Sequence, residues 1–502
     1  MWSVDPRTGK QREQVADEAT AADVDAAVRA AHETLPALAD RVVRAAFLRA
    51  AAKRLEADGE RIVATADAES ALGEPRLIGE LARTTGQLRA FADEIEDGGY
   101  LDVIIDHADP TLTPPRPDLR RYKLPIGVVA VYAASNFPLA FSVPGGDTAS
   151  ALAAGCPVVV KAHPDHPATS ALCGAALRAA AVDSGLPEDV VSVVYGFEAG
   201  VELVRHPLVS AAGFTGSVKG GRALFDAAAA RPRPIPFHGE LGSLNPVVIT
   251  REAVAERAEQ IGEGLGGSTT LGTGQFCVKP GLVLVPEGQD GDRMLDKLSE
   301  TLRGTAPGHL LDDRMRQAFL AGVAERAALE RVEAPVVAGA GDEERTVRPG
   351  LFTVSARELG DEHELLLEEC FGPVTVAVRY ADEAEAEAVL ARVPGSLTAT
   401  VHLGTDEAAG SEGAASLVER LTAVAGRVLV NGWPTGVAVA PAQHHGGPYP
   451  ATTSTSTSVG ATAIERWLRP VAFQNTPEAL LPPELRDGNP LGLPRRVDGV
   501  RE

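Results

Sequence analysis

The chain has 502 residues, of which 44% are hydrophobic and 23% are charged, an ordinary globular composition that excludes a disordered, collagen-like or coiled-coil chain. Its 69 acidic residues outnumber the 47 basic ones, and the net charge of −22 argues against partners such as nucleic acid or an anionic membrane surface. At this length we expect roughly three domains.

The first part of the chain has the periodicity of long helices. Residues 20–57 are rich in alanine, with apolar residues such as Val24 and Val28 at helical spacing, and residues 76–96 form a second helical run. Prolines then interrupt residues 109–125, which predicts an extended segment.

Short apolar runs and helical segments alternate from residue 126 to residue 230. The predicted strands are 126–132, 157–161, 190–195 and 211–214, and the predicted helices are 145–154, 169–184, 200–205 and 218–230. This alternation predicts a doubly wound parallel sheet, which binds ligands at the carboxyl ends of its strands. A second α/β stretch spans residues 245–440, and the hydroxyl-rich run 451–458 predicts a loop.

Cysteine usage points to a reducing compartment. The four cysteines are Cys156, Cys173, Cys277 and Cys370. They are too few and too scattered for a disulfide framework, and none forms the C-x-x-C pair of a structural zinc site, so we expect no metal. The start lacks an export leader and no apolar run reaches about 18 residues, which predicts a cytoplasmic protein without a membrane span.

Three residues are candidates for chemistry. Cys277 lies in a glycine-rich turn, where backbone N–H groups and the nearby Lys279 favour the thiolate of a nucleophile, although a buried packing role is equally open. Glu240, between two glycines, is a candidate base with a pKa raised by desolvation, or else a solvated loop residue. The amide of Asn136 could donate to an oxyanion, or Asn136 could simply shape a turn.

Two further positions suit a nucleotide cofactor. Gly216 and Ser217 follow a predicted strand and open a helix, where free N–H groups would bind a pyrophosphate, or where Ser217 would only cap the helix. Lys161 ends a buried strand, where its amine would meet a ribose or phosphate, or would only extend to solvent at the sheet edge.

Six short motifs occur in a fixed order along the chain. They are Asn136-Phe137-Pro138, Lys161, residues 214–217, residues 240–243, residues 274–277 and residues 369–374. This series resembles the aldehyde dehydrogenase superfamily over nearly the whole length. Residues 445–452, 473–475 and 489–492 are similar to one branch, the 2,5-dioxovalerate (α-ketoglutarate semialdehyde) dehydrogenases, to which NADP-linked fatty aldehyde dehydrogenases are related.

The resemblance implies a three-part α/β organisation. A Rossmann-like cofactor domain would comprise residues 1–108 and 126–239, and an α/β catalytic domain would comprise residues 240–440. Residues 109–125 and 441–502 would form a small β oligomerisation flap with a C-terminal tail. The resemblance also implies a homodimer or homotetramer.

The resemblance gives each candidate a role in the chemistry. Cys277 would attack the aldehyde carbon to form a thiohemiacetal, and Asn136 would bind the oxyanion together with the Cys277 backbone N–H. Glu240 would activate the water that hydrolyses the thioacyl enzyme.

The resemblance also places the cofactor. Lys161 would bind the adenosine ribose, Gly216 and Ser217 would lie beside the pyrophosphate, Glu369 would bind the nicotinamide ribose, and Phe371 would pack near the nicotinamide ring.

Departures from the family pattern bear on specificity. Pro164 replaces the Glu that many NAD-preferring members carry three residues after the lysine. With no carboxylate there to repel a 2′-phosphate, and with His163 beside it, we expect NADP to be preferred over NAD. Ser135 replaces a common Trp, which would widen or re-polarise the substrate tunnel.

The leading hypothesis is therefore hydrolytic, NAD(P)-dependent oxidation of 2,5-dioxopentanoate to 2-oxoglutarate. An alternative is the same chemistry on medium- or long-chain aliphatic aldehydes. A CoA-acylating enzyme is disfavoured by Glu240, and a non-catalytic protein by the intact Cys277 and Glu240. A thiol hydrolase would need an oriented Cys–His pair, which the sequence does not indicate, and His444 and His445 are expected to be structural.

Overall fold

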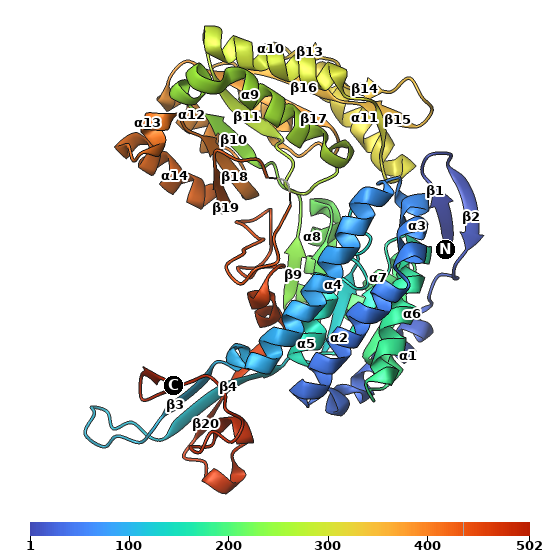
Figure 1. Cartoon of the computed structure of the whole chain (residues 1–502), viewed down its shortest axis with the longest axis vertical. Coiled ribbons are helices and arrows are strands. Elements are labelled where there is room, and N and C mark those ends of the chain that lie inside the picture. Colours follow the sequence, from blue (N-terminus) through green and yellow to red (C-terminus); the bar gives the residue numbers. More distant parts are fainter. Residues whose placement is uncertain (435) are drawn as a thin grey trace.

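Two lobes and an arm make up the structure, each built on its own β-sheet (Figure 1). The computed structural model describes residues 1–434 and 436–502. A hairpin of β1 (Trp2–Asp5) and β2 (Lys10–Gln14) lies at the N-terminus. Within the described ranges, no helix combines the length and apolarity that a membrane span requires.

The first lobe holds the predicted parallel sheet, in the order β7-β6-β5-β8-β9. Its strands are β5 (Val128–Tyr132), β6 (Val158–Lys161), β7 (Val191–Val194), β8 (Val209–Thr215) and β9 (Phe237–Glu240). The helices of this lobe are α1 (Ala21–Glu33), α2 (Arg41–Ala57), α3 (Gly59–Ser70), α4 (Glu74–Asp97), α5 (Gly146–Ala154), α6 (Pro167–Asp183), α7 (Phe197–Arg205) and α8 (Val218–Ala229).

Helices cover both faces of this sheet, which explains its continuous apolar strands. Alternate side chains of β5 point to opposite faces, so Val129 and Val131 pack with α2, α5 and α6, whereas Val128 and Ala130 pack with α1, α7 and α8. The strands and helices expected from the sequence are all present, although α7 begins at Phe197, earlier than predicted.

The second lobe is built on a seven-stranded sheet in the order β13-β16-β17-β11-β10-β18-β19. The strands are β10 (Pro246–Ile249), β11 (Leu282–Pro286), β13 (Glu333–Val336), β16 (Gly350–Ser355), β17 (Val374–Tyr380), β18 (Ser396–His402) and β19 (Ala425–Val430). All neighbours are parallel except β13 and β16.

Six helices and a small sheet complete this lobe. The helices are α9 (Arg251–Thr270), α10 (Gln289–Gly304), α11 (Asp313–Ala327), α12 (Glu383–Leu390), α13 (Thr405–Ala408) and α14 (Glu412–Val424), and the small sheet joins β12 (Gly308–His309), β15 (Thr346–Arg348) and β14 (Gly339–Ala340). The predicted α/β fold is confirmed in both lobes.

The arm extends from the first lobe and carries the C-terminus, at the lower left of Figure 1. Its sheet has the order β20-β4-β3-β21-β22. The strands are β3 (Val103–Asp106), β4 (Leu119–Pro125), β20 (Leu468–Gln474), β21 (Arg495–Val497) and β22 (Val500–Arg501). The sheet thus begins at β3, within residues that the sequence analysis assigned to the cofactor domain, and not at the predicted boundary of 109.

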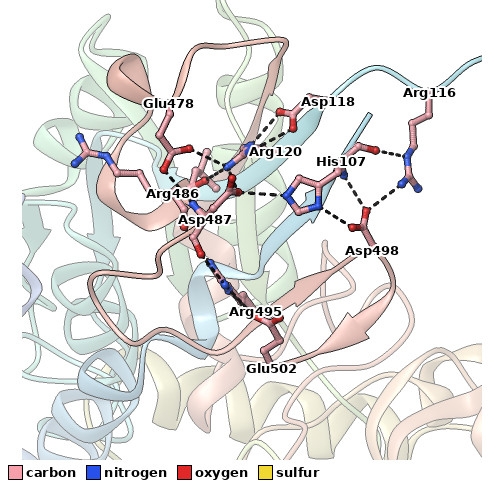
Figure 2. A network of polar contacts seen from close by, with 11 residues as sticks. His107, Arg116, Asp118, Arg120, Glu478, Arg486, Asp487, Arg495, Asp498 and Glu502 are labelled. Atoms are coloured by element: carbon pink, nitrogen blue, oxygen red, sulfur yellow. Dashed lines mark hydrogen bonds and ion pairs between the residues drawn. The ribbon is translucent and has the colours of Figure 1, made fainter. Parts of the chain in front are cut away.

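Charged side chains tie the C-terminal segment to this sheet (Figure 2). The His107 ring lies 2.7 Å from an Asp498 carboxylate oxygen, and Arg116 donates to the same carboxylate at 3.0 Å. Arg120, which is nearly buried, pairs with Asp487 at 2.6 Å. These contacts hold residues that are far apart in the sequence in one network.

Candidate active site

A cavity of about 210 Å³ receives side chains from both lobes. Seven of the nine predicted site residues line it, namely Asn136, Gly216, Ser217, Glu240, Cys277, Glu369 and Phe371. The sheet order explains part of this assembly, because β5, β8 and β9 are parallel neighbours and Asn136, Gly216 and Glu240 lie at or just beyond their carboxyl ends.

The loop that carries Cys277 packs against the 369–374 segment and is hydrogen-bonded by Asn245. Gly274 has φ +68°, and a Cβ there would collide with the carbonyl group of Gly372. The Asn245 amide donates to the carbonyl oxygens of Cys277, at 2.8 Å, and Lys279, at 3.0 Å. Because Gly274 has no Cβ, the turn can approach the 369–374 segment closely, and Cys277 lies beside it.

The Cys277 thiol is protonated in this environment. Burial, reinforced by the carboxylates of Glu240 and Glu369, raises its pKa to about 12. The expected help from Lys279 is absent, because its amine turns away to donate to the carbonyl oxygens of Val374, at 2.7 Å, and Cys370, at 3.2 Å. The prediction of a favoured thiolate is wrong for this state, and an adjacent base is needed.

A histidine that the sequence analysis regarded as structural lies beside this thiol. His445 Nε2 is 3.6 Å from Cys277 Sγ. Burial, with the nearby charge of Arg427, lowers the pKa of His445 to about 3, so its ring is neutral and can accept a hydrogen bond from the thiol, but it is too weak a base to take the thiol proton. The Cys–His pair that was judged missing is present. Its members are 168 positions apart, and this separation leaves no spacing signal that could have revealed the pair.

Glu240 is buried and held by an arginine that sequence reasoning also missed. Burial raises the pKa of Glu240 to about 8, as expected for a candidate base. Its Oε1 accepts a 2.7 Å hydrogen bond from Arg466 Nη2, and its buried Oε2 has no hydrogen-bond partner in the part of the chain that the structure describes. Arg466, whose side chain is 0% exposed, also pairs with Asp147 at 3.2 Å.

The predicted loop 451–458 completes the wall around Glu240. Glu240 forms an isolated β-bridge with Thr452, and the Thr453 hydroxyl accepts from the Gly239 N–H at 2.8 Å. Ser456 Oγ accepts from Arg466 Nε at 3.1 Å. The hydroxyl-rich run 451–458 therefore provides polar contacts to Glu240 and Arg466.

Asn136 reaches the nucleophile loop directly. Its Nδ2 donates to the Gln275 carbonyl at 3.0 Å, and its own carbonyl accepts from Arg76 at 2.6 Å. An amide has two donors, so a second N–H of Asn136, which lines the cavity together with Cys277, remains available for a ligand.

Groups suited to an anion and to a polar ligand also line this cavity. Gly216 and Ser217 precede α8, whose N-terminal N–H groups form an anion site, and Ser217 Oγ also caps this helix by accepting from Gly220 N at 3.2 Å. A Cβ at Gly242 would lie 2.8 Å from a carboxylate oxygen of Glu369, so the glycine admits this side chain. Burial raises the pKa of Glu369 to about 7.

The other two predicted residues, Lys161 and His163, lie outside this cavity. Lys161 ends β6 with its amine 5.0 Å from the centre of the Phe197 ring, and burial lowers its pKa to about 8. Burial holds the pKa of His163 well below its usual value, so His163 is neutral. Arg314 of α11 approaches from the other lobe, over the same Phe197 ring and 3.2 Å from Asp165.

Comparisons with known proteins place most of the chain in one family. The aldehyde dehydrogenase family model matches residues 1–469. The α-ketoglutaric semialdehyde dehydrogenase 2 of Azospirillum brasilense is 46% identical over 493 residues, covering 96% of this chain and 93% of that protein. The α-ketoglutaric semialdehyde dehydrogenase of Acinetobacter baylyi is 42% identical over 487 residues, covering 96% and 92%.

A solved structure shows the same fold. The glyceraldehyde-3-phosphate dehydrogenase GapN of Methanocaldococcus jannaschii, complexed with NADP, superposes with a TM-score of 0.80 at 17% identity, covering 94% of this chain and 98% of that one. With a family match over most of its length and a relative at 46% identity, the chain belongs to the aldehyde dehydrogenase family of NAD- or NADP-dependent oxidoreductases.

Proposed function

We propose that the protein oxidises 2,5-dioxopentanoate to 2-oxoglutarate without CoA, and that it prefers NADP. The two relatives named for α-ketoglutaric semialdehyde support the substrate. The observation that carries the hydrolytic chemistry is one cavity with a thiol at Cys277, an amide donor at Asn136 and an unpartnered carboxylate oxygen at Glu240.

The first step is addition of the thiol to the aldehyde. The ionised Glu240, the stronger base in the cavity, takes the proton of Cys277 while Sγ forms a bond to the carbonyl carbon, and His445 Nε2 lies 3.6 Å from Sγ as a hydrogen-bond partner. The oxygen gains the negative charge, and the free N–H of Asn136, with the backbone N–H of Cys277, stabilises it. Bound NAD or NADP supplies the acceptor for the hydride that leaves this carbon.

The second step is hydrolysis of the thioester on Cys277. Glu240 Oε2 accepts a proton from a water molecule, whose oxygen attacks the acyl carbon. The C–S bond breaks, the carboxylic acid leaves, and the Cys277 thiolate regains a proton. Because the pKa of Glu240 is about 8, a large share of this residue is ionised near neutral to mildly alkaline pH.

Support for NADP lies around Lys161. No carboxylate occupies position 164, and the carboxylate of Asp165 is engaged by Arg314 at 3.2 Å. The amine of Lys161 and the guanidinium of Arg314 both lie near Phe197, where two cations would favour a bound 2′-phosphate. Comparing kcat/KM for NADP and NAD tests the preference, and a strong preference for NAD would refute it.

The arm is the proposed oligomerisation surface, and its charged network fixes the shape that it would present to another subunit. Light scattering after size exclusion, with a shortened 109–118 loop as the variant, tests for a homodimer or homotetramer.

A specific observation favours the aliphatic alternative. Apolar side chains, among them Phe137, Phe141, Met315 and Leu397, line much of the cavity. The deciding experiment follows formation of the reduced cofactor, without CoA, from 2,5-dioxopentanoate and from hexanal, for wild type and Cys277→Ala. Turnover of the dioxo acid that the substitution abolishes supports the proposal, whereas turnover of hexanal alone moves the function to aliphatic aldehydes.

A further inference from the structure

One face of α4 carries charged residues toward the active-site cavity. Arg76, Glu80 and Arg83 follow the i, i+4, i+7 spacing of a single helical face. The Arg83 guanidinium lies 5.0 Å from the ring centre of Phe141 and 5.9 Å from that of Phe137. Both rings line the cavity, so Arg83 lies directly behind its aromatic wall.

Arg83 makes no direct ion pair in the part of the chain that the structure describes. Its Nε and Nη2 are buried and have no hydrogen-bond partner among residues 1–434 and 436–502, and no carboxylate in those ranges lies within ion-pair distance. Arg89, on the same helix, makes two hydrogen bonds of 2.6 Å to the Glu56 carboxylate. The contrast shows that the lack of a partner is specific to the cavity side of the helix.

The nearby Glu80 attracts Arg83 electrostatically but makes no ion pair or hydrogen bond with it in the described chain. Its Oε1 already accepts from the backbone N–H groups of Leu139, at 2.8 Å, and Ala140, at 2.9 Å, and burial raises its pKa. A second arginine, Arg427 of β19, also has buried Nε and Nη2 atoms that lack partners in the described chain. A desolvated, unpaired guanidinium is costly, so a bound anion would complete the site.

A series of neighbouring side chains links the thiol to Arg83. His445 is 3.6 Å from Cys277 Sγ, its ring is 6.1 Å from that of Phe141, and Phe141 contacts the Arg83 guanidinium. Cys277, His445, Phe141 and Arg83 are thus successive neighbours along the cavity wall.

We propose that Arg83 anchors the carboxylate of an ω-oxo acid whose aldehyde carbon lies at Cys277. This inference rests on the proposed function and adds the residue that would separate oxo acids from neutral aldehydes. The planar guanidinium can donate two parallel hydrogen bonds to a carboxylate, and the aromatic wall would contact the methylene groups between.

The test compares Arg83→Met with the matched control Arg89→Met on the same helix. We expect kcat/KM for 2,5-dioxopentanoate to fall about 100-fold in Arg83→Met, while kcat/KM for pentanal, the neutral aldehyde of equal carbon number, stays within threefold. Arg89→Met should leave both substrates unchanged. Equal loss on both substrates, or no loss on the oxo acid, would overturn the inference.

A binding measurement avoids dependence on turnover. Glutarate should protect Cys277 from alkylation by iodoacetamide in wild type and in Arg89→Met, but not in Arg83→Met. If Arg83→Met does not fold, Arg83→Lys keeps the charge without the planar pair of donors and should lose about tenfold on the oxo acid alone. A protection constant that is the same in every folded variant would contradict the anchor.

The two proposals fail in different ways. If wild type oxidises pentanal better than 2,5-dioxopentanoate, the proposed substrate is wrong. If wild type prefers the oxo acid and the Arg83 variants keep that preference, the function stands and Arg83 is not the anchor.

Discussion

Replacing Arg466 by Met should move the pH dependence of hydrolysis. Arg466 Nη2 lies 2.7 Å from Glu240 Oε1, and both side chains are buried. Opposite charges about 4 Å apart at an effective dielectric constant of about 20 attract by ~4 kcal/mol, which corresponds to about 3 pKa units. Without the guanidinium, the pKa of Glu240 would therefore rise from about 8 towards about 11.

The sign of the change follows from the state that reacts. Glu240 must be ionised to accept the proton of water, so raising its pKa lowers the active fraction at any pH below the new value. At about pH 8 this fraction would fall from about one half to about one in a thousand, and kcat should fall by about 10²- to 10³-fold. Hydride transfer precedes this step, so a stopped-flow trace should keep a burst of one reduced cofactor per active site.

The assay records burst amplitude and steady-state rate over about pH 6 to 10. Arg469→Met, an exposed position close in sequence, is the matched control and should behave as wild type. Arg466→Lys keeps a cation and should restore much of the rate, which separates electrostatics from damage to folding. An Arg466→Met protein that is folded, with an unmoved pH profile and kcat within threefold of wild type, would refute the reasoning.

Four further outcomes are expected. Alkylation of Cys277 in the free enzyme should accelerate about tenfold per pH unit from neutral to about pH 10, because only the thiolate reacts and its pKa is about 12; a rate independent of pH would contradict the protonated thiol. His445→Gln should slow the burst by only about tenfold, the effect of a weakened hydrogen bond to the thiol, while leaving cofactor affinity, measured by fluorescence titration, unchanged. Gly274→Ala should cost about 3 kcal/mol of unfolding free energy by denaturant titration, because its Cβ meets a backbone carbonyl at positive φ; a value near zero would show that the loop can shift. The pKa of His107 is raised mainly by Asp498, so its contribution to stability is complete below its unfolded pKa and is lost as pH rises through the raised value; hydrogen exchange of β21 and β22 should accelerate over that interval in wild type, and His107→Gln should exchange fast even at acidic pH.

Local pattern was sufficient to predict most elements of the first lobe. The buried β-branched runs of β5 and β6 read directly as strands, and parallel strands bring their carboxyl ends to one edge, so a ligand site was expected there. No strand was predicted before Glu240, and its place beside Asn136 was implied only by the resemblance. The quoted family motifs added Cys277, Glu369 and Phe371, which come from the other lobe.

Side-chain contacts between segments far apart in the sequence could not be predicted from the sequence. Arg466 is 226 residues from the carboxylate that it holds, and nothing in its own surroundings indicates that partner. Lys279 shows the opposite error, because it is close to Cys277 in sequence but directs its amine elsewhere. Side-chain direction in an irregular loop depends on tertiary packing and not on separation along the chain.

The arm also bears on the order of events during synthesis. Strand β4 spans residues 119–125, and its hydrogen-bonded neighbour β20 spans residues 468–474. On the ribosome the first lobe can begin to fold long before β20 has been made, which leaves one edge of β4 open for most of translation. Such an open edge is a site for wrong pairing between nascent chains. Slow translation or loss of β20 should therefore reduce soluble yield more than it reduces the activity of the molecules that do fold.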